Sequence, residues 1–223
     1  RDLVRSRGLG DVYKRQGKKE CKKGAMIGTG GQAAAQLEAM LAARKLEEVK
    51  IFDLNEERCK AFAEEMQKKL VKYGAKIIPA KDSDDCIEDA DLIITVTPSA
   101  KPVFDGTKVK AGATISCVGT YEPHKHELDP AVLPRASKII CDSKEAALSE
   151  TGDLLIPIAD GIITEKDVLG SLGDVINGKI KGRENDEEII VYETVGVAAQ
   201  DLVAAKVIYD KAVEAGKGLR WGE

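Results

Sequence analysis

The chain has 223 residues and a formal net charge of -4, with 34 Lys and Arg against 38 Asp and Glu. This balance excludes the strongly basic classes, such as nucleic-acid-binding proteins and proteins that bind anionic membranes. The hydrophobic fraction of 43% excludes a disordered chain, and no apolar run approaches the ~20 residues that span a bilayer. The five cysteines are scattered singly, which favours the reducing cytoplasm over a disulfide framework or a zinc site. We therefore expect a cytoplasmic protein of mixed composition.

The beginning of the chain differs from the rest. It starts at Arg1, and its first 24 residues are strongly basic whereas the remainder is acidic. A basic arm can bind a polyanion, but this one lacks helical or strand periodicity and interleaved aromatic residues. Residues 1–16 look like a translated adaptor tail, and we expect them to be a non-native or disordered leader. The native part is then expected to begin near Gly17, with something missing upstream.

From Gly24 onward, short apolar runs alternate with amphipathic stretches, which is typical of repeated strand–helix units. Helices are expected at 32–46 and 55–72. Strands are expected at 25–27, 49–52, 77–79, 92–96, 114–118 and 138–141. Because these strands are nearly continuous apolar runs, they fit a parallel sheet that is covered on both faces. The pattern predicts an α/β fold with a Rossmann-type, doubly wound parallel sheet.

The pattern changes after Ser143. A helix is expected at 167–176, a strand at 189–192, and a long Ala-rich helix at 197–215 that Gly216 ends. The apolar residues of this last helix cover more than one stripe, so the helix needs packing partners on more than one side. We expect it to form an exposed apolar patch through which the chain associates.

A glycine-rich turn between the first strand and the first helix fits the pattern G-x-G-x-x-A. Its residues are Gly28, Thr29, Gly30, Gly31, Gln32 and Ala33. In this pattern the first glycine permits a tight turn and the second lets the backbone approach a pyrophosphate. The small third position allows close packing of strand and helix, and the helix N-terminus supplies free N–H donors. The alternative is a glycine-rich turn with no ligand.

An acidic residue, Asp53, ends the second strand. In a dinucleotide-binding unit, a carboxylate at this place accepts hydrogen bonds from the adenosine ribose. It would repel a 2′-phosphate, so Asp53 favours NAD over NADP. Leu54 and Asn55 complete the turn, and Arg58 either pairs with a phosphate or is simply solvated. S-adenosylmethionine-dependent methyltransferases share these features, although Ala33 and a helix that begins directly at the turn favour a dinucleotide.

Several motifs, in order along the chain, resemble one family. They are IGTGGQAAAQLEAM (27–40), TVTPSAKPVFDG (95–106), ISCVGTYEPHKHELDPAVLPRA (115–136), GKIKGR (178–183) and YETVGVAAQDLVAA (192–205). Together they resemble the ornithine cyclodeaminase and mu-crystallin family, which includes ketimine reductases and archaeal-type alanine dehydrogenases. The resemblance runs from about Gly24 to Ala215. It implies a two-domain, usually dimeric enzyme that uses a nicotinamide cofactor.

The resemblance also implies roles for further residues at the ends of the predicted strands. Thr95, Val96 and Thr97 would line the adenosine–phosphate side of the cleft, unless the threonines only fill the strand. Two further pairs would lie near the nicotinamide ring: Val118 with Gly119, and Val195 with Gly196.

The same resemblance implies that a substrate domain, with a catalytic lysine and substrate-binding arginines, belongs to the half of the family fold that precedes Gly17. We therefore expect residues 17–160 to be the NAD(P)-binding domain. Residues 161–223 would complete this domain and return to a second, mostly missing one. On this interpretation the chain alone is inactive.

The segment after the fifth strand departs from the cyclodeaminase pattern. Where cyclodeaminases carry an aspartate, this chain has Tyr121, a proton donor or a packing residue. Glu122 supplies a carboxylate only if the loop shifts by one residue. His124 is a candidate proton carrier or an ordinary loop histidine, and the pair His124 and His126 is poor evidence for a metal.

These features favour an oxidoreductase that moves a hydride between NAD and the C=N/CH–NH group of a small imino or amino acid, of the Δ1-pyrroline-2-carboxylate type. The alternatives are ornithine cyclodeaminase, a lyase, and a non-catalytic protein like mu-crystallin that binds a nucleotide or small ligand. A homodimer is expected, with neither nucleic acid nor membrane as a partner. Three other acidic residues, Glu127, Asp129 and Asp153, are expected to cap helices or to be solvated.

Overall fold

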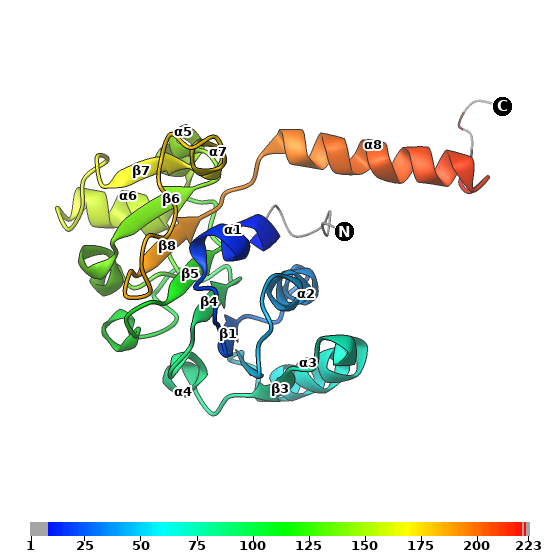
Figure 1. Ribbon diagram of the computed structural model, residues 1–223, viewed down its shortest axis with the longest axis horizontal. Coiled ribbons are helices and arrows are strands. Elements are labelled where there is room, and N and C mark those ends of the chain that lie inside the picture. Colours follow the sequence, from blue (N-terminus) through cyan, green and yellow to red (C-terminus); the bar gives the residue numbers. More distant parts are fainter. Residues whose placement is uncertain (1–8, 220, 222–223) are drawn as a thin grey trace.

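The computed structural model describes residues 9–219 and 221. Its described strands form a single parallel sheet in the order β3-β2-β1-β4-β5-β8-β6-β7 (Figure 1). The strands are β1 (Lys23–Ile27), β2 (Glu48–Phe52), β3 (Lys76–Pro79), β4 (Leu92–Thr95), β5 (Thr114–Cys117), β6 (Lys138–Cys141), β7 (Val168–Ser171) and β8 (Ile190–Glu193). This arrangement confirms the predicted doubly wound α/β fold.

Helices cover both faces of the sheet. They are α1 (Leu9–Gln16), α2 (Ala33–Ala43), α3 (Glu56–Lys69), α4 (Ser83–Ile87), α5 (Lys144–Glu150), α6 (Gly152–Ala159), α7 (Leu172–Ile176) and α8 (Ala198–Glu214). Three short 3-10 turns accompany them: η1 (Val71–Tyr73), η2 (Gly106–Lys108) and η3 (Pro130–Arg135).

Two cores result from the alternation of side chains along each strand. On one face, Met26 and Ile94 belong to a cluster with residues of α1, α2 and α3. On the other face, Ile27 and Ile93 belong to a cluster with residues of α4, η3, α5 and α6. Each buried aliphatic side chain contributes roughly 1.5–3 kcal/mol of transfer free energy, so both faces must be covered.

The last third of the fold differs in part from the expectation. Residues 167–176 were expected to form one helix, but Val168–Ser171 are strand β7, which pairs with β6, and only Leu172–Ile176 are helical. Val168 is buried and Leu169 exposed, as in a strand with one covered face. A capping box of Ser171 and Asp174 then starts α7. Strands β7 and β8 complete the sheet, whereas the domain boundary at residue 160 stays a prediction.

The structure also differs from the expectation for the leader. Residues 1–8 lie outside the described residues, but Leu9–Gln16 form α1, which contacts α2 and β5. Val12 and Tyr13 are fully buried. The carbonyl of Gln16 accepts hydrogen bonds from Thr114 Oγ1 at 2.9 Å and from Arg183 Nε at 2.6 Å. The packing of α1 could not be predicted from the sequence, because its few apolar residues lie within a strongly basic segment.

We expect Tyr13→Ala to destabilise the chain by about 3 to 5 kcal/mol, because the variant leaves a cavity where a fully buried aromatic ring packs. Urea unfolding measures this loss, and Arg15→Ala, at an exposed position of the same helix, is the control. An unfolding free energy equal to that of the wild type would contradict the packing of α1 on the core.

Helix α8 leaves the sheet and runs away from the body of the molecule (Figure 1). None of its residues is buried, and Leu202 and Ile208 are 72% and 59% exposed. This confirms the exposed apolar patch expected for the last helix. Among the described residues, no helix combines the length and the apolar character needed to cross a membrane.

We expect the patch on α8 to make the chain self-associate, because contact between exposed apolar side chains removes them from water. Sedimentation velocity should show species larger than the monomer. The double variant Leu202→Ser/Ile208→Ser should shift the distribution towards the monomer, whereas Gln200→Ser/Lys211→Ser on the same helix should not. A monodisperse monomeric wild type would contradict this expectation.

Candidate functional site

The sheet changes direction next to β1. From β1 the chain builds outward to β2 and β3, and then returns to place β4 and β5 on the other side. All these strands are parallel, so their carboxyl ends lie along one edge. Ligands of open α/β sheets bind at such a switch point, outside the carboxyl ends.

The turn after β1 has the geometry of an anion cradle. Gly28 has a φ of 106°, and a Cβ there would lie 2.6 Å from the carbonyl oxygen of Val96, so no other residue fits. By contrast, nothing lies within 4 Å of the Cβ positions of Gly30 and Gly31. Helix α2 begins directly after this turn, and its N-cap Gln32 makes no side-chain capping bond. Ala33 N already donates to the carbonyl oxygen of Gly30 at 3.1 Å, so the N–H groups of Ala34 and Ala35 are the ones available to an anion.

Asp53 lies beside this turn at the end of β2. Its Oδ2 accepts hydrogen bonds from Thr29 N at 3.1 Å and Thr29 Oγ1 at 2.6 Å. Its Oδ1 accepts from Asn55 N at 2.9 Å and from Arg58 at 2.7 Å. Burial works to raise the pKa of Asp53, but the hydrogen bonds from Thr29, Arg58 and Asn55 outweigh it and lower the pKa. The carboxylate is thus charged and held in place.

A cavity of about 660 Å³ opens next to Asp53. Its walls come from the ends of β2 and β3 and include Phe52, Leu54, Pro79 and Ala80. Leu54 is 95% exposed, so an apolar side chain stands free at the mouth. The cavity has the size of a small-ligand site.

The loops after β4 and β5 touch each other through their backbones. A Cβ at Gly119 would lie 2.0 Å from the carbonyl oxygen of Thr97, so only glycine permits the contact. The Glu127 carboxylate bridges the same two loops. Its Oε2 accepts from Thr97 N at 2.7 Å and Thr97 Oγ1 at 2.8 Å, while its Oε1 accepts from Gly119 N at 2.7 Å and Val118 N at 3.2 Å.

Glu127 was expected to cap or to be solvated, and this expectation is wrong, since the residue is fully buried. Burial and the nearby charge of Asp153 raise the pKa of Glu127 to about 7, against the hydrogen bonds that lower it. Asp153 is also buried, at the start of α6. Its Oδ1 accepts from Glu127 N and Leu128 N, and Thr120 Oγ1 donates to its Oδ2. Sequence reasoning had no signal for this, because the polar run around Glu127 resembles a surface loop.

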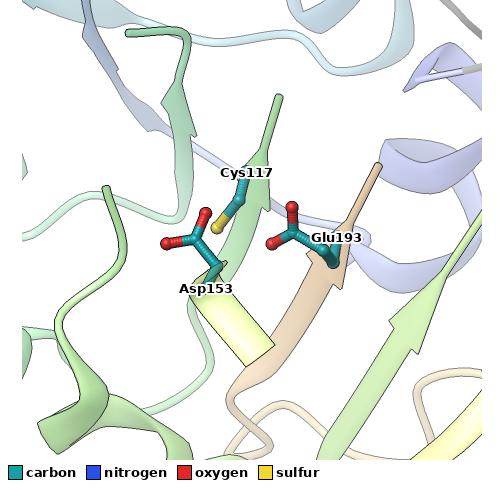
Figure 2. A group of neighbouring side chains, drawn as sticks. All are labelled: Cys117, Asp153 and Glu193. Atoms are coloured by element: carbon teal, nitrogen blue, oxygen red, sulfur yellow. The ribbon is translucent and has the colours of Figure 1, made fainter. Parts of the chain in front are cut away.

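Figure 2 shows Asp153 together with Cys117 and Glu193, whose ligand atoms all lie within 4.8 Å of one another. A metal would need a thiolate and free carboxylate oxygens. Burial raises the pKa values of the Cys117 thiol and of Glu193 well above their ordinary range, which disfavours the deprotonated forms that a metal needs. Hydrogen bonds already occupy Asp153. We therefore assign no metal to this group, and the absence of a metal from the protein stays a prediction.

The candidate catalytic residues lie on the loop that follows β5. Tyr121 is 65% exposed. The Glu122 carboxylate pairs with Lys125 and lies 3.4 Å from His124 Nε2. The hydrogen bond from Lys125 lowers the pKa of Glu122, so this carboxylate is a poor proton donor. The structure thus groups Glu122 and His124 on an exposed loop, and the catalytic roles of these residues and of Tyr121 stay predictions.

The remaining predicted residues fall into two places. Thr95 is fully buried and pairs with Cys117 across β4 and β5, which agrees with a strand-filling role. Val195 and Gly196 follow β8, where Gly196 N donates to Asp142 Oδ2 at 2.7 Å and Thr194 Oγ1 donates to the same oxygen at 2.6 Å. Asp142, which the sequence did not single out, thus holds the loop after β8 to the end of β6.

A family model described as the ornithine cyclodeaminase/mu-crystallin family matches residues 14–216. The chain belongs to this family. It is 40% identical over 195 residues to a Δ1-pyrroline-2-carboxylate reductase of Bacillus cereus, covering 87% of this chain and 59% of that protein. It is 36% identical to an alanine dehydrogenase of Archaeoglobus fulgidus, covering 86% of this chain and 57% of that protein. The chain therefore spans less than two thirds of these relatives.

One solved structure of the family superposes closely. It is Thermococcus litoralis Δ1-pyrroline-2-carboxylate reductase in complex with NADH and L-proline, with a TM-score of 0.92 and 34% identity. The match covers 98% of this chain and 67% of that chain. The family resemblance inferred from the motifs is thereby confirmed.

Glu127 makes the stability of the chain depend on pH. Its pKa rises on folding from 4.5 to about 7, because of burial first and of Asp153 second, so the folded state holds the proton more tightly than the unfolded state. The resulting stabilisation is complete below pH 4.5 and is lost as the pH rises through 7. When the pH rises from about 5.5 to about 8, we expect the unfolding free energy of the wild type to fall by about 2 kcal/mol more than that of Glu127→Gln, as measured by urea unfolding. Equal losses would contradict the raised pKa.

Proposed function

We propose that this chain forms the NAD-binding part of an oxidoreductase that acts on a small imino or amino acid. The observation that carries the proposal is the edge formed by the open turn at Gly30 and Gly31, the uncapped N-terminus of α2, and the charged Asp53 beside them. This combination fits a pyrophosphate next to a ribose. The reductase in the solved structure binds NADH, which agrees with the proposal.

The turn Gly28–Ala33 would hold the pyrophosphate through backbone N–H groups. Asp53 would accept hydrogen bonds from the ribose hydroxyls, and the adenine would enter the cavity beside Leu54. When bound, the reduced cofactor supplies a hydride. The ring would lie above the ends of β4 and β5, near Val118, Gly119, Val195 and Gly196.

The charge of Asp53 favours NAD over NADP. A 2′-phosphate would face a carboxylate whose lowered pKa keeps it ionised. Arg58 is the nearest cation, but its guanidinium already pairs with Asp53 at 2.7 Å. It would therefore neutralise a phosphate only by leaving the carboxylate.

We expect the chain to bind NADH, measured by ligand fluorescence, more tightly than NADPH. Asp53→Ala should weaken NADH binding by about tenfold or more, the usual effect of losing a charged hydrogen bond. Because the variant also releases Arg58, the preference for NADH over NADPH should shrink.

Asp167→Ala is a matched control, since Asp167 Oδ2 accepts from Thr164 N and Thr164 Oγ1 just as Asp53 Oδ2 accepts from Thr29. It should leave NADH binding unchanged. A folded wild type that binds neither nucleotide would overturn the proposal, and binding of S-adenosylmethionine would replace it with the methyltransferase alternative.

For the whole protein we propose reduction of a cyclic imine of the Δ1-pyrroline-2-carboxylate type. A hydride goes to the imine carbon and a proton to the nitrogen, which gives the cyclic amino acid. The relative at 40% identity, a Δ1-pyrroline-2-carboxylate reductase, supports this interpretation. So does Tyr121, which stands where the resemblance implies an aspartate in cyclodeaminases. Ornithine cyclodeaminase activity and binding without catalysis are the alternatives.

The three hypotheses for the whole protein give different products. A reductase consumes NADH in proportion to the imine added. A cyclodeaminase releases ammonia from ornithine without net change in NADH. A binding protein does neither.

We further propose that the whole protein is a cytoplasmic homodimer whose partner is the small imino or amino acid. Neither nucleic acid nor a membrane surface is a partner in this proposal. We expect the present chain alone to bind NADH without turnover, and NADH oxidation on addition of the imine would contradict this.

A further inference from the structure

Glu127 has an unusual set of contacts for a residue outside the glycine-rich turn. Its two carboxylate oxygens accept four hydrogen bonds from two loops that follow different strands. Thr97 belongs to the loop after β4, and Val118 and Gly119 to the loop after β5. The backbone of Glu127 joins the two loops as well, because its carbonyl oxygen accepts from Val103 N of the loop after β4 at 2.9 Å, and the backbones of Thr97 and Gly119 are in contact.

The position of these loops follows from the topology. If Asp53 marks the ribose at the end of β2 and the turn at Gly30 marks the pyrophosphate at the end of β1, the cofactor runs across the sheet edge from β2 towards β1. The next strand ends in that direction are those of β4 and β5. The nicotinamide half must therefore lie over the loops that Glu127 joins.

We propose that Glu127 is a positioning residue for the nicotinamide half of the cofactor, which it orients by holding the loops after β4 and β5 at a fixed separation. This inference rests on the proposed binding of NAD. Glu127 does not touch the cofactor, because its side chain is fully buried beneath the loops. It acts through the backbone of Thr97 and Gly119, which forms the surface that the ring meets.

The chemistry of the bridge requires a carboxylate. Three of the four donors are backbone N–H groups, which cannot turn round to accept a hydrogen bond. An ionised carboxylate is acceptor-only and satisfies all of them. A glutamine of the same shape would direct its NH₂ group at one of the two loops and leave at least one N–H unpaired.

Three titratable groups face Glu127 from the surrounding elements: Asp153 from α6, Cys117 from β5 and Glu193 from β8. Asp153 supports the bridge directly, because it accepts hydrogen bonds from the backbone of Glu127 and Leu128. Glu193 differs from Glu127, since it receives one long hydrogen bond, from Thr151 Oγ1 at 3.3 Å, and its pKa lies well above the usual range. Glu193 thus accepts one hydrogen bond where Glu127 accepts four.

This difference provides a matched pair of variants. At about pH 8, Glu127→Gln replaces an acceptor of four hydrogen bonds, whereas Glu193→Gln replaces, with a group of the same shape, a carboxyl that accepts only one. We expect Glu127→Gln to weaken NADH binding by about tenfold and Glu193→Gln by less than about twofold. ADP-ribose, which lacks the nicotinamide ring, should bind equally well to the wild type and both variants.

The ADP-ribose measurement separates positioning from general damage. A merely structural defect would weaken both ligands, as Asp53→Ala also should. The inference is overturned if Glu127→Gln binds NADH as tightly as the wild type, or if its affinities for NADH and for ADP-ribose fall by the same factor. If the wild type binds neither ligand, the proposed function itself has failed.

Thr97→Val provides a second variant in case Glu127→Gln does not fold. It removes one of the four donors and leaves the carboxylate in place. We expect a smaller loss of NADH affinity, about threefold, again without a change for ADP-ribose. An unchanged NADH affinity would contradict the inference.

The wild type offers a test by pH. Lowering the pH through about 7 should weaken the binding of NADH but not that of ADP-ribose, because protonation at the pKa of Glu127 removes the acceptor that the bridge needs.

Discussion

Backbone N–H groups in the loops just beyond the carboxyl ends of parallel strands lie outside the hydrogen-bond ladder of the sheet and need other acceptors. Most of the site in this protein follows from how these groups are satisfied. Acidic side chains accept many of them. Asp53 binds the loop after β1, Glu127 the loops after β4 and β5, and Asp142 the loop after β8. In each case a carboxylate holds a loop that follows a strand other than the one before its own segment. These loops are thus tied together by the chain's own side chains.

The N-terminus of α2 is treated differently. Its N-cap Gln32 makes no capping bond and its first turn carries no acidic residue, while α3, α5 and α6 all have side-chain caps. The positive end of the α2 dipole therefore faces the open glycine turn without an acidic residue in its own first turn. The same chain thus uses its own carboxylates to satisfy the loops and leaves this helix end without a side-chain cap.

The carboxylates of the site also differ in charge. Arg58 and Thr29 keep Asp53 ionised at the mouth of the cavity, whereas burial without a cation raises the pKa values of Glu127 and Glu193. Hydrogen bonds from Gly119 and Thr97 counteract this rise at Glu127 and leave its pKa at about 7. Environment, and not residue type, thus separates the pKa values of these three carboxylates.

Local patterns in the amino-acid sequence were enough to predict the sheet apart from β7, the glycine turn, the place of Asp53 and the family. Apolar runs specify buried strands, and the spacing of Gly28, Gly30 and Ala33 specifies one turn between strand and helix. The exposed face of α8 was also predictable, since its apolar residues exceed one stripe.

Strand β7, the packing of α1 and the roles of Glu127 and Asp153 came instead from contacts between distant parts of the chain. A short polar or basic segment has no periodicity that reports burial, and its environment comes from partners far along the chain. Glu127 lies in a run that resembles a solvated loop. It becomes a buried bridge because two strand ends, separate in the sequence, present their N–H groups to it.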